Sequence, residues 1–331
     1  MSKNKAKGKH RKQMPAADYT DLFENFYNNE VNRWKLLNEN LDLLSAAIDE
    51  EKTIQSLENS KWEIYARKVN YRKGSLSAKV DNESLAKRPC FLCSDNRPDE
   101  QGVMHWEGYD ILANPYPLAD MHFTIASTEH IPQRIAGRIK DMARIARMLP
   151  DNCVFYNGAM CGASAPDHFH FQSFQGSLSM NMWRPLDELR EILKLGKSRV
   201  CVPHTGETPF PYLIIDSAAD KELTEIFDLI YKALPEAEPE PMMNIVMLKN
   251  CGRMLTLIVP RRRHRPSTYG TGEGEMLISP ASVEMLGTFI TSRDEDFDRL
   301  DSETVNQIYR EVCLTDSMFD EVISRLTAGQ Q

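Results

Sequence analysis

One short segment, His168-Phe169-His170-Phe171-Gln172, constrains the fold of this chain more than any other. In a β-strand, successive side chains point to opposite faces of the sheet. His168, His170 and Gln172 would therefore share one face, while the two phenylalanines would point into a core on the other. The alternation predicts a half-buried strand with a row of polar groups along one side.

Small residues dominate the segment before this strand, from Asn157 to Asp167. They let a backbone come close to an anion, and the N–H groups of such a turn can bind phosphate. An isolated pair of histidines in a strand is more often packing or surface, but a histidine beside a phosphate loop is typical of nucleotidyl transfer. His170 is the candidate nucleophile, because a neutral imidazole attacks phosphorus at pH 7. We expect a backbone carbonyl to hold its other ring nitrogen protonated.

Gln172 is the second candidate catalytic residue. Its amide can donate a hydrogen bond to a phosphate oxygen without giving a proton to the leaving group. A third histidine at this position would favour hydrolysis, whereas glutamine favours transfer to an acceptor other than water. We expect the backbone around Gly162, the Ser164 hydroxyl and Asn157 to stabilise the charge of the transferring group.

Four residues are candidate ligands of a metal ion. Cys90 and Cys93 form a CxxC pair, which can also be a redox pair or two unmetallated thiols. Zinc needs four nitrogen or sulfur ligands in a tetrahedron, so two more must come from elsewhere. His130 follows an apolar strand and His168 opens the histidine strand. We expect a structural zinc ion held by these four residues, with no open coordination position.

Composition places the chain among globular proteins, with 41% hydrophobic and 27% charged residues in 331. No apolar run approaches the roughly 20 residues of a membrane helix, so no membrane is expected as a partner. Residues 1–17 are basic and are expected to form a disordered tail without a secretory signal. The net charge of −8 makes nucleic acid an unexpected partner, with RNA contact through the tail as a lesser alternative. Seven scattered cysteines indicate a reducing cytoplasm.

The sequence predicts that the chain divides into four segments. The tail is followed by a helical extension over residues 18–86, in which leucines recur at helical spacing. Residues 87–200 alternate strands with one helix, over 135–149, and indicate an α+β half that carries the candidate residues. Residues 201–331 are expected to be a second, degenerate copy, because residues 257–266 align with residues 123–132 without a gap and share a histidine and a proline.

Together these motifs resemble the histidine-triad superfamily, in its HxHxQ transferase branch. Four segments carry the resemblance. Cys90–Arg97 resembles the family's zinc loop, and Ile111–Tyr116 resembles the strand that holds base and ribose. Ser127–His130 resembles the third zinc-ligand segment, and Asn157–Gln172 resembles the phosphate loop with the catalytic strand. The branch includes galactose-1-phosphate uridylyltransferases, dinucleoside polyphosphate phosphorylases and GDP-hexose phosphorylases. The stretch from Gly162 to Phe174 is most similar to the GDP-hexose phosphorylases.

The resemblance implies a duplicated histidine-triad-like fold and a nucleotidyl-histidine intermediate. It implies a GDP-hexose phosphorylase that gives sugar 1-phosphate and nucleoside diphosphate. The alternatives are a hexose-1-phosphate uridylyltransferase, a dinucleoside polyphosphate phosphorylase or a non-catalytic nucleotide sensor. Leu92, Leu112 and Asn114 would contact base and ribose. The partners would be a nucleotide sugar and phosphate or a sugar phosphate, and a homodimer is left open.

Several basic residues are further candidates for binding substrate phosphate. One group lies in the second half, where a solvated charged loop is the equal alternative: Arg261, Arg262, Arg263 and Arg265. The other group lies in the N-terminal extension: Arg72, Lys73 and Lys79.

Overall fold

The computed structural model describes residues 16–55, 63–149, 151–175 and 186–328. The tail expected over residues 1–17 lies outside these ranges, except for its last two residues, which begin helix α1 (Ala16–Arg33). Within the described ranges, no helix combines the length and the apolar character that crossing a bilayer requires.

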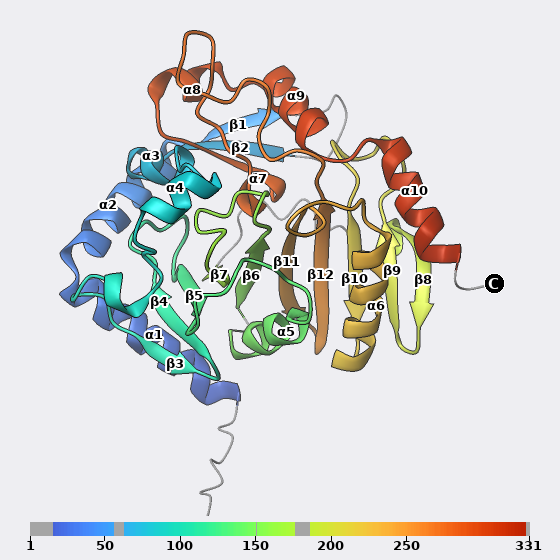
Figure 1. Ribbon diagram of the computed structural model, residues 1–331, viewed down its shortest axis with the longest axis horizontal. Helices are drawn as coiled ribbons and strands as arrows, with labels where there is room; N and C mark the ends of the chain where they lie inside the picture. The colour runs from blue at the N-terminus through green and yellow to red at the C-terminus, as the bar shows by residue number, and fades with distance from the viewer. Residues whose placement is uncertain (1–15, 56–62, 150, 176–185, 329–331) are drawn as a thin grey trace, which may run out of the picture.

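A ten-stranded antiparallel sheet forms the centre of the molecule (Figure 1). The strands lie in the order β3-β4-β5-β7-β6-β11-β12-β10-β9-β8. The first five are β3 (Met104–Trp106), β4 (Tyr109–Ala113), β5 (Phe123–Ser127), β6 (Asn152–Asn157) and β7 (His170–Gln175). The other five are β8 (Arg190–Leu195), β9 (Ser198–Val202), β10 (Leu213–Ser217), β11 (Met243–Asn250) and β12 (Arg253–Pro260). Strands β6 and β11 pair, so the sheet is continuous across both halves.

The two halves repeat one topology, which confirms the expected duplication. Each has three strands, a helix and two more strands, and in each the last strand inserts between the third and the fourth. The helices are α5 (Ile139–Met148) and α6 (Asp220–Ala233). The second half therefore begins with β8, before the expected boundary at residues 200 and 201. The alignment of residues 257–266 with 123–132 is wrong, because it equates β12 with β5, whereas β12 occupies the place of β7.

Side-chain alternation along β7 separates two cores. Phe169 and Phe171 are fully buried in the core between the sheet and helices α5 and α6, which α1 and α10 (Asp316–Thr327) complete. Phe174 belongs to the core on the opposite face, toward which His170 and Gln172 also point. The expected half-buried strand is confirmed from position 170 onward, but His168 precedes it.

The N-terminal extension contains strands as well as helices. Its elements are α2 (Lys35–Asp49), β1 (Lys52–Gln55), β2 (Glu63–Lys68), the 3-10 helix η1 (Asn70–Arg72), α3 (Lys73–Leu76) and α4 (Asn82–Lys87). Strand β2 pairs with β1 and, in parallel, with β13 (Thr288–Thr291) from the other end of the chain. The partial alternation from Trp62 to Val69, within the extension expected to be mainly helical over 18–86, had indicated that a strand could begin there, and β2 is that strand.

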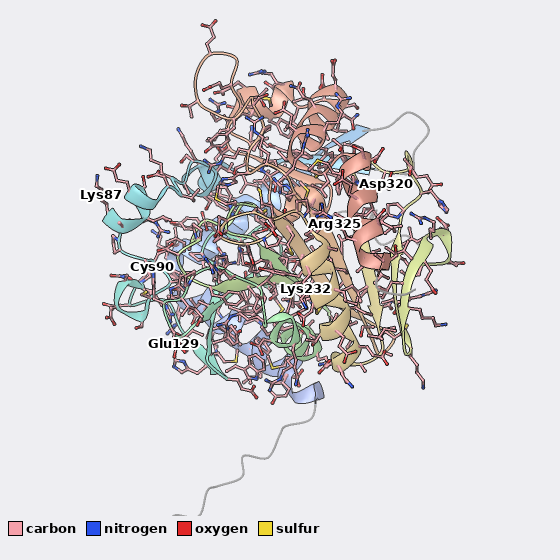
Figure 2. The ribbon with its side chains drawn as sticks, turned by 45° about the vertical axis from the view of Figure 1, so that its right-hand side comes forward. Lys87, Cys90, Glu129, Lys232, Asp320 and Arg325 are labelled. Carbon is pink, nitrogen blue, oxygen red and sulfur yellow. The ribbon has the colours of Figure 1, made fainter. Side chains whose placement is uncertain are left out.

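Three helices near the end of the chain cover the same face of the sheet as β1 and β2: α7 (Ser282–Met285), α8 (Asp294–Arg299) and α9 (Ser302–Val312). Helix α10 packs on the opposite face, against α6. Cys90 and Glu129 of the first half lie on the opposite side of the molecule from Asp320 and Arg325 of α10 (Figure 2). The N-terminal extension and the α7–β13 segment meet where β2 pairs with β13, and both line one cavity together with His170 and Gln172 of β7.

Candidate active site

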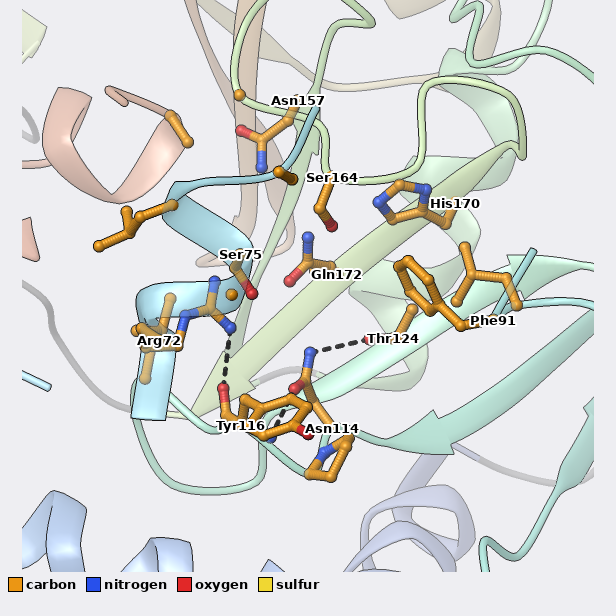
Figure 3. Close-up of a pocket in the computed structure, with 18 of the residues that line it drawn as sticks. Arg72, Ser75, Phe91, Asn114, Tyr116, Thr124, Asn157, Ser164, His170 and Gln172 are labelled. Carbon is orange, nitrogen blue, oxygen red and sulfur yellow. Dashed lines mark hydrogen bonds between the residues drawn. The ribbon is translucent and has the colours of Figure 1, made fainter. Parts of the chain in front are cut away.

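A cavity of about 700 Å³ lies over this face of the sheet. Three parts of the chain line it: the N-terminal extension, the first half with its phosphate loop, and the segment between Ser279 and Ile290. His170 and Gln172 point into it from β7 (Figure 3). All six residues expected to contact nucleotide also line it: Leu92, Leu112, Asn114, Asn157, Gly162 and Ser164.

The ring of His170 is held in the tautomer that nucleophilic attack requires. Its Nδ1–H donates to the carbonyl of His168 at 2.9 Å, so Nε2 carries the free lone pair. The side chain is only 3% exposed, and this burial lowers the pKa of His170 to about 4. The imidazole is therefore neutral at pH 7.

Gln133, which sequence reasoning missed, fixes the backbone on which His170 stands. Its Nε2 donates to the carbonyls of Asn157 and His170, each at 3.0 Å, and its Oε1 accepts the His170 backbone N–H at 2.8 Å. This fully buried amide ties the ends of β6 and β7 together. Its partners are 24 and 37 residues away, so no local pattern could have revealed it.

His122 is a second missed residue, and it orients Gln172. The backbone N–H of Leu118 donates to His122 Nδ1 at 3.2 Å, so the ring proton sits on Nε2. That Nε2–H donates to Gln172 Oε1 at 2.9 Å. The amide nitrogen of Gln172 therefore faces the cavity. Burial lowers the pKa of His122 to about 3, with a smaller contribution from Arg72, and so keeps the ring neutral. The only sign of His122 in the sequence was its position beside an apolar strand.

Asn157 is oriented in the same sense as Gln172. Its Oδ1 accepts three hydrogen bonds: from Asn244 Nδ2 at 2.9 Å, from the Ser282 N–H at 2.8 Å and from the Ser282 hydroxyl at 2.7 Å. A carbonyl oxygen with three donors leaves the amide nitrogen as the group offered to the cavity (Figure 3). Asn244 and Ser282 belong to the second half, so the second half fixes the orientation of the Asn157 amide.

The phosphate loop uses its small residues for packing against the protein itself. Gly162 has a φ of +94°, and a Cβ added there would lie 2.5 Å from the Cβ of Ala281. Glycine was expected here because it lets the backbone come close to an anion, and in this structure it also lets the loop pack against Ala281 of the second half. The Ser164 side chain lies beside His170 and Gln172 (Figure 3).

The expected base and ribose residues form the far wall of the cavity. Leu92 and Leu112 are buried, and the half-exposed Phe91 lines the same cavity. Asn114 donates from Nδ2 to Thr124 Oγ1 at 3.0 Å and accepts the Tyr116 N–H at 2.9 Å. An apolar slot with an ordered amide at its edge is suited to a planar base and its sugar.

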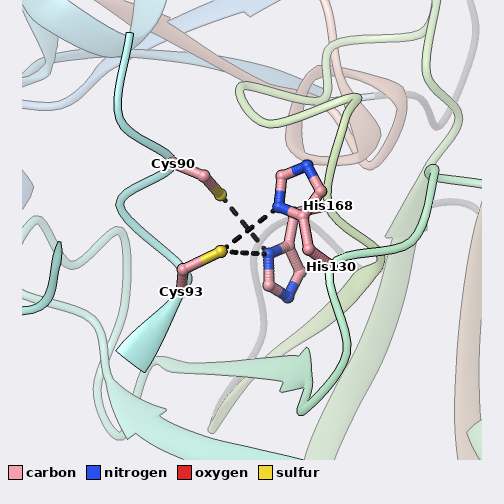
Figure 4. A group of neighbouring side chains, drawn as sticks. All are labelled: Cys90, Cys93, His130 and His168. Carbon is pink, nitrogen blue, oxygen red and sulfur yellow. Dashed lines mark hydrogen bonds between the residues drawn. The ribbon is translucent and has the colours of Figure 1, made fainter. Parts of the chain in front are cut away.

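The four expected metal ligands form one cluster (Figure 4). Their ligand atoms lie within 4.8 Å of one another. Cys90 Sγ is 3.3 Å from His168 Nδ1, and Cys93 Sγ is 3.2 Å from His130 Nδ1. Zinc bonds of about 2.3 Å to sulfur and 2.0 Å to nitrogen would separate neighbouring ligands by roughly 3.5 Å, so the donor set and spacing fit zinc.

Outer partners orient both histidines of this cluster. His168 Nε2–H donates to the Ser127 carbonyl at 2.8 Å, and His130 Nε2 lies 3.8 Å from an oxygen of Asp167. Each ring therefore presents Nδ1 inward, the arrangement that metal-binding histidines usually show. The cluster ties the Cys90 loop to the residue two positions before His170.

Comparison with known proteins agrees with the fold. Residues 26–175 match the family described as "Domain of unknown function (DUF4922)", and residues 192–329 match "GDPGP1-like, C-terminal domain". The crystal structure of yeast Ap4A phosphorylase Apa2 superposes with a TM-score of 0.55 at 16% identity, covering 85% of this chain and 97% of that one. The chain has the fold of this phosphorylase.

Two further structures of the yeast protein extend the likeness. Its complex with Ap4A gives a TM-score of 0.52 at 13% identity, covering 85% of this chain and 97% of that one. Its complex with AMP gives 0.50 at 14%, covering 84% and 96%. No curated protein gives a significant match. The expected α+β, histidine-triad-like fold with N-terminal helices is thereby confirmed.

The arginines of the second half that were expected to bind phosphate make hydrogen bonds within the chain. Arg261 is 2% exposed and donates to Asn244 Oδ1 at 2.6 Å and to the carbonyls of Pro280 and Val312. None of the four expected there is among the described residues that line the cavity: Arg261, Arg262, Arg263 and Arg265. The sequence cannot show that their guanidinium groups bond to their own chain. In the extension, Arg72 and Lys79 line the cavity, whereas Lys73 is exposed outside it.

Proposed function

We propose that this protein is a nucleotidyltransferase that acts through a nucleotidyl-histidine on His170, and specifically a GDP-hexose phosphorylase. A nucleoside diphosphate sugar would bind in the cavity, and phosphate would take the nucleotidyl group. The products would be sugar 1-phosphate and nucleoside diphosphate. The cysteine pattern of the sequence supports a cytoplasmic setting for this reaction.

The chemistry balances without a general acid. Nε2 of His170 forms a bond to the α-phosphorus, and the bond from that phosphorus to the bridging oxygen breaks. The sugar phosphate leaves with the electron pair and is stable as an anion, because its second pKa is about 6. Phosphate oxygen then attacks the same phosphorus, and the electron pair of the broken P–N bond returns to Nε2. The proton stays on Nδ1 throughout, hydrogen-bonded to the His168 carbonyl.

One observation carries this proposal: the cavity presents a free imidazole nitrogen beside amide donors whose carbonyl oxygens are already used. His170 offers Nε2, while Gln172 and Asn157 each offer an NH2 group fixed by partners behind it. Donors aimed in advance at a charged phosphoryl group are the arrangement that stabilises its transfer. No side chain with an exchangeable acidic proton is needed at position 172, which favours transfer over hydrolysis.

The comparisons support the phosphorylase reading from two directions. The second half matches a GDPGP1-like domain, and the fold is that of a yeast Ap4A phosphorylase. A dinucleoside polyphosphate phosphorylase is accordingly the second candidate, favoured by that likeness. A hexose-1-phosphate uridylyltransferase remains the third. All three share the intermediate on His170 and differ in base and leaving group.

We further propose that Cys90, Cys93, His130 and His168 hold a structural zinc ion. The metal would fix the loop that carries Leu92 and the start of the catalytic strand. It would have no open coordination position, and every step above uses the chain's own groups.

The test is the mass of the intact protein after brief exposure to substrate. GDP-glucose, GDP-mannose, UDP-glucose and diadenosine tetraphosphate are each mixed with the protein without phosphate. A nucleotidyl adduct on the wild type that is missing in His170→Ala supports the mechanism, and its mass identifies the base. Nucleotide binding with no adduct and no turnover with phosphate would instead favour a nucleotide sensor.

A further inference from the structure

Arg261 is a buried cation that forms no ion pair with a carboxylate of the described residues. It directly follows strand β12. A guanidinium has five N–H donors, and all five are used, by Asn244 Oδ1 and by four carbonyls, those of Pro280, Val312, Arg263 and His264. No donor is left for a ligand. A buried charge of this kind acts on its surroundings only through the groups that it contacts.

The shortest of these hydrogen bonds leads to the cavity through two amides. Arg261 Nη1 donates to Asn244 Oδ1 at 2.6 Å, and Asn244 Nδ2 donates to Asn157 Oδ1 at 2.9 Å. The amide nitrogen of Asn157 then faces the cavity that Ser164 and His170 also line (Figure 3). The sheet places Asn244 for this contact, because β11 pairs with β6 and Asn244 lies directly opposite Asn157. The guanidinium and the two amides thus form one hydrogen-bonded row that ends at the cavity.

The same guanidinium also holds the other partner of Asn157. Ser282 donates to Asn157 Oδ1 from its N–H at 2.8 Å and from its hydroxyl at 2.7 Å. Arg261 Nη1 donates to the Pro280 carbonyl at 3.2 Å, two residues before Ser282. Arg261 therefore reaches Asn157 by two routes, through Asn244 and through the segment that carries Ser282.

The row fixes the direction of both amides. A reversed Asn244 side chain would turn its NH2 group toward the guanidinium, where donor would face donor. It would also lose the hydrogen bond that Nδ2 donates to the Cys161 carbonyl at 2.8 Å. In the observed direction each amide has its oxygen toward the cation, and hydrogen bonds in such a row polarise one another. The NH2 group of Asn157 therefore presents more positive charge to the cavity than an isolated amide would.

We propose that Arg261 is a positioning residue for the phosphoryl group that His170 attacks, and that it acts through Asn244 and Asn157 without touching the ligand. This inference rests on the proposed function. Negative charge spreads over the oxygens of a phosphoryl group during transfer. Dipoles that are aimed at this charge in advance stabilise it without reorganising. The arginine that the sequence marked as a phosphate ligand thus serves the phosphate from behind two amides.

An affinity measurement separates this role from packing alone. GMP and guanosine differ in the phosphate that Asn157 would contact, and ligand-observed NMR can measure their binding to the full chain, with AMP and adenosine as a second pair. We expect Arg261→Met to weaken GMP about fivefold, the effect of one misaligned neutral hydrogen bond, and to leave guanosine unchanged. Unchanged guanosine binding also shows that the variant is folded.

The matched control is Arg262→Met, which removes the next charge along the chain. Arg262 is exposed, and it donates to the carbonyls of Glu311 and Arg310. These contacts do not lead to Asn157, so Arg262→Met should change the affinity of neither ligand.

A double-mutant cycle shows whether Arg261 acts through Asn157. In the Asn157→Ala background the amide is gone, so adding Arg261→Met should leave the GMP affinity at the value of Asn157→Ala alone. A purely structural contribution would instead weaken GMP by the same factor in both backgrounds. The same cycle applies to the rate at which GDP-glucose labels His170, where we expect a loss of about fivefold that disappears in the Asn157→Ala background.

Asn244→Asp tests the row without removing the cation. Aspartate keeps the acceptor for Arg261 and gives the guanidinium a carboxylate partner, but it cannot donate to Asn157 Oδ1. We expect this variant to bind GMP about fivefold more weakly than the wild type and guanosine equally well. It decides the question even if Arg261→Met fails to fold.

Three results would each overturn the proposal: parallel losses of GMP and guanosine, an equal loss of GMP with and without Asn157, or an unchanged GMP affinity in both variants. A wild type that binds neither GMP nor AMP would overturn it as well. The adduct on His170 tests the proposed function separately. If the adduct forms but the cycle shows no coupling, the function stands and the role of Arg261 fails. Coupling without an adduct means the reverse.

Discussion

Two replacements of His122 separate its two hydrogen bonds. Asparagine places its side-chain oxygen near the position of Nδ1, so His122→Asn keeps an acceptor for the Leu118 N–H and loses the donor to Gln172. Glutamine reaches the position of Nε2, so His122→Gln keeps the donor to Gln172 and loses the acceptor. The ring is fully buried, and the two bonds measure 3.2 and 2.9 Å.

The structure predicts opposite effects for the two variants. In His122→Asn the amide of Gln172 loses one neutral hydrogen bond, worth about 1 kcal/mol, and can turn its oxygen toward the phosphate. We expect kcat/KM to fall about fivefold or more. In His122→Gln the buried Leu118 N–H is left without an acceptor, which costs about 1–3 kcal/mol of stability, while kcat/KM stays closer to that of the wild type.

The measurements are phosphorolysis kinetics with the donor that labels the wild type, and urea denaturation of the three proteins. If His122 orients the amide of Gln172, His122→Asn is the less active variant and His122→Gln is the less stable one. If activity simply follows stability across the three proteins, His122 only packs the strand, and the account of Gln172 is wrong.

Four further outcomes follow from other parts of the structure. The pKa of His122 is lowered to about 3 in the folded chain, so its neutral form contributes stability that is complete above pH 6.5 and is lost as the pH falls toward 3. Between pH 6 and 4, the unfolding free energy of His122→Asn should therefore fall less steeply with decreasing pH than that of the wild type. The two slopes should differ by about 1.4 kcal/mol per pH unit at most. Asn157→Asp keeps the oxygen that accepts three hydrogen bonds but turns a carboxylate oxygen toward the phosphate, and kcat/KM should drop at least about 100-fold with little change in melting temperature. Arg261→Met should lower the unfolding free energy by about 3 kcal/mol or more in urea denaturation, because this buried arginine donates to Asn244 Oδ1 and to the carbonyls of Pro280 and Val312. Elemental analysis should find about one zinc per chain, and Cys90→Ser should lower both the metal content and the melting temperature.

The parts of the site that were predictable from the sequence depend on local periodicity or on ligand chemistry. The alternation around His170 fixes which side chains share a face wherever the segment is a strand, and the CxxC spacing brings two thiols together in any loop. The metal cluster is assembled as expected, although His168 reaches it from a turn before β7 and not from the strand itself. Predictions of this kind hold even where the expected ends of strands and helices are wrong by a few residues. Helix α5, for example, begins at Ile139 and not at residue 135, because Gly137 has a φ of +76° just before it.

The residues that sequence reasoning missed act through partners far away in the chain. Gln133, His122 and Glu240 have no spacing that marks them, and their roles appear only when distant segments meet. The buried carboxyl of Glu240 accepts the Ile135 N–H at 2.9 Å and the hydroxyl of Tyr156, and burial raises the pKa of Glu240 to about 7. The arginines of the second half show the converse, since their charge suggested a ligand and their packing uses the charge within the fold.

The two halves contribute differently to the cavity. Strand β12 occupies the position of β7 but carries no histidine, so the second half has no counterpart of His170 there. It instead supplies Asn244 and Ser282, which turn the amide of Asn157 toward the cavity, and Arg265, which holds the segment that bears Arg72. A phosphoryl group needs donors in fixed orientation more than it needs acid or base catalysis. The amides of Gln172 and Asn157 obtain a fixed orientation from hydrogen bonds made behind them, and for Asn157 those bonds come from the second half of the chain.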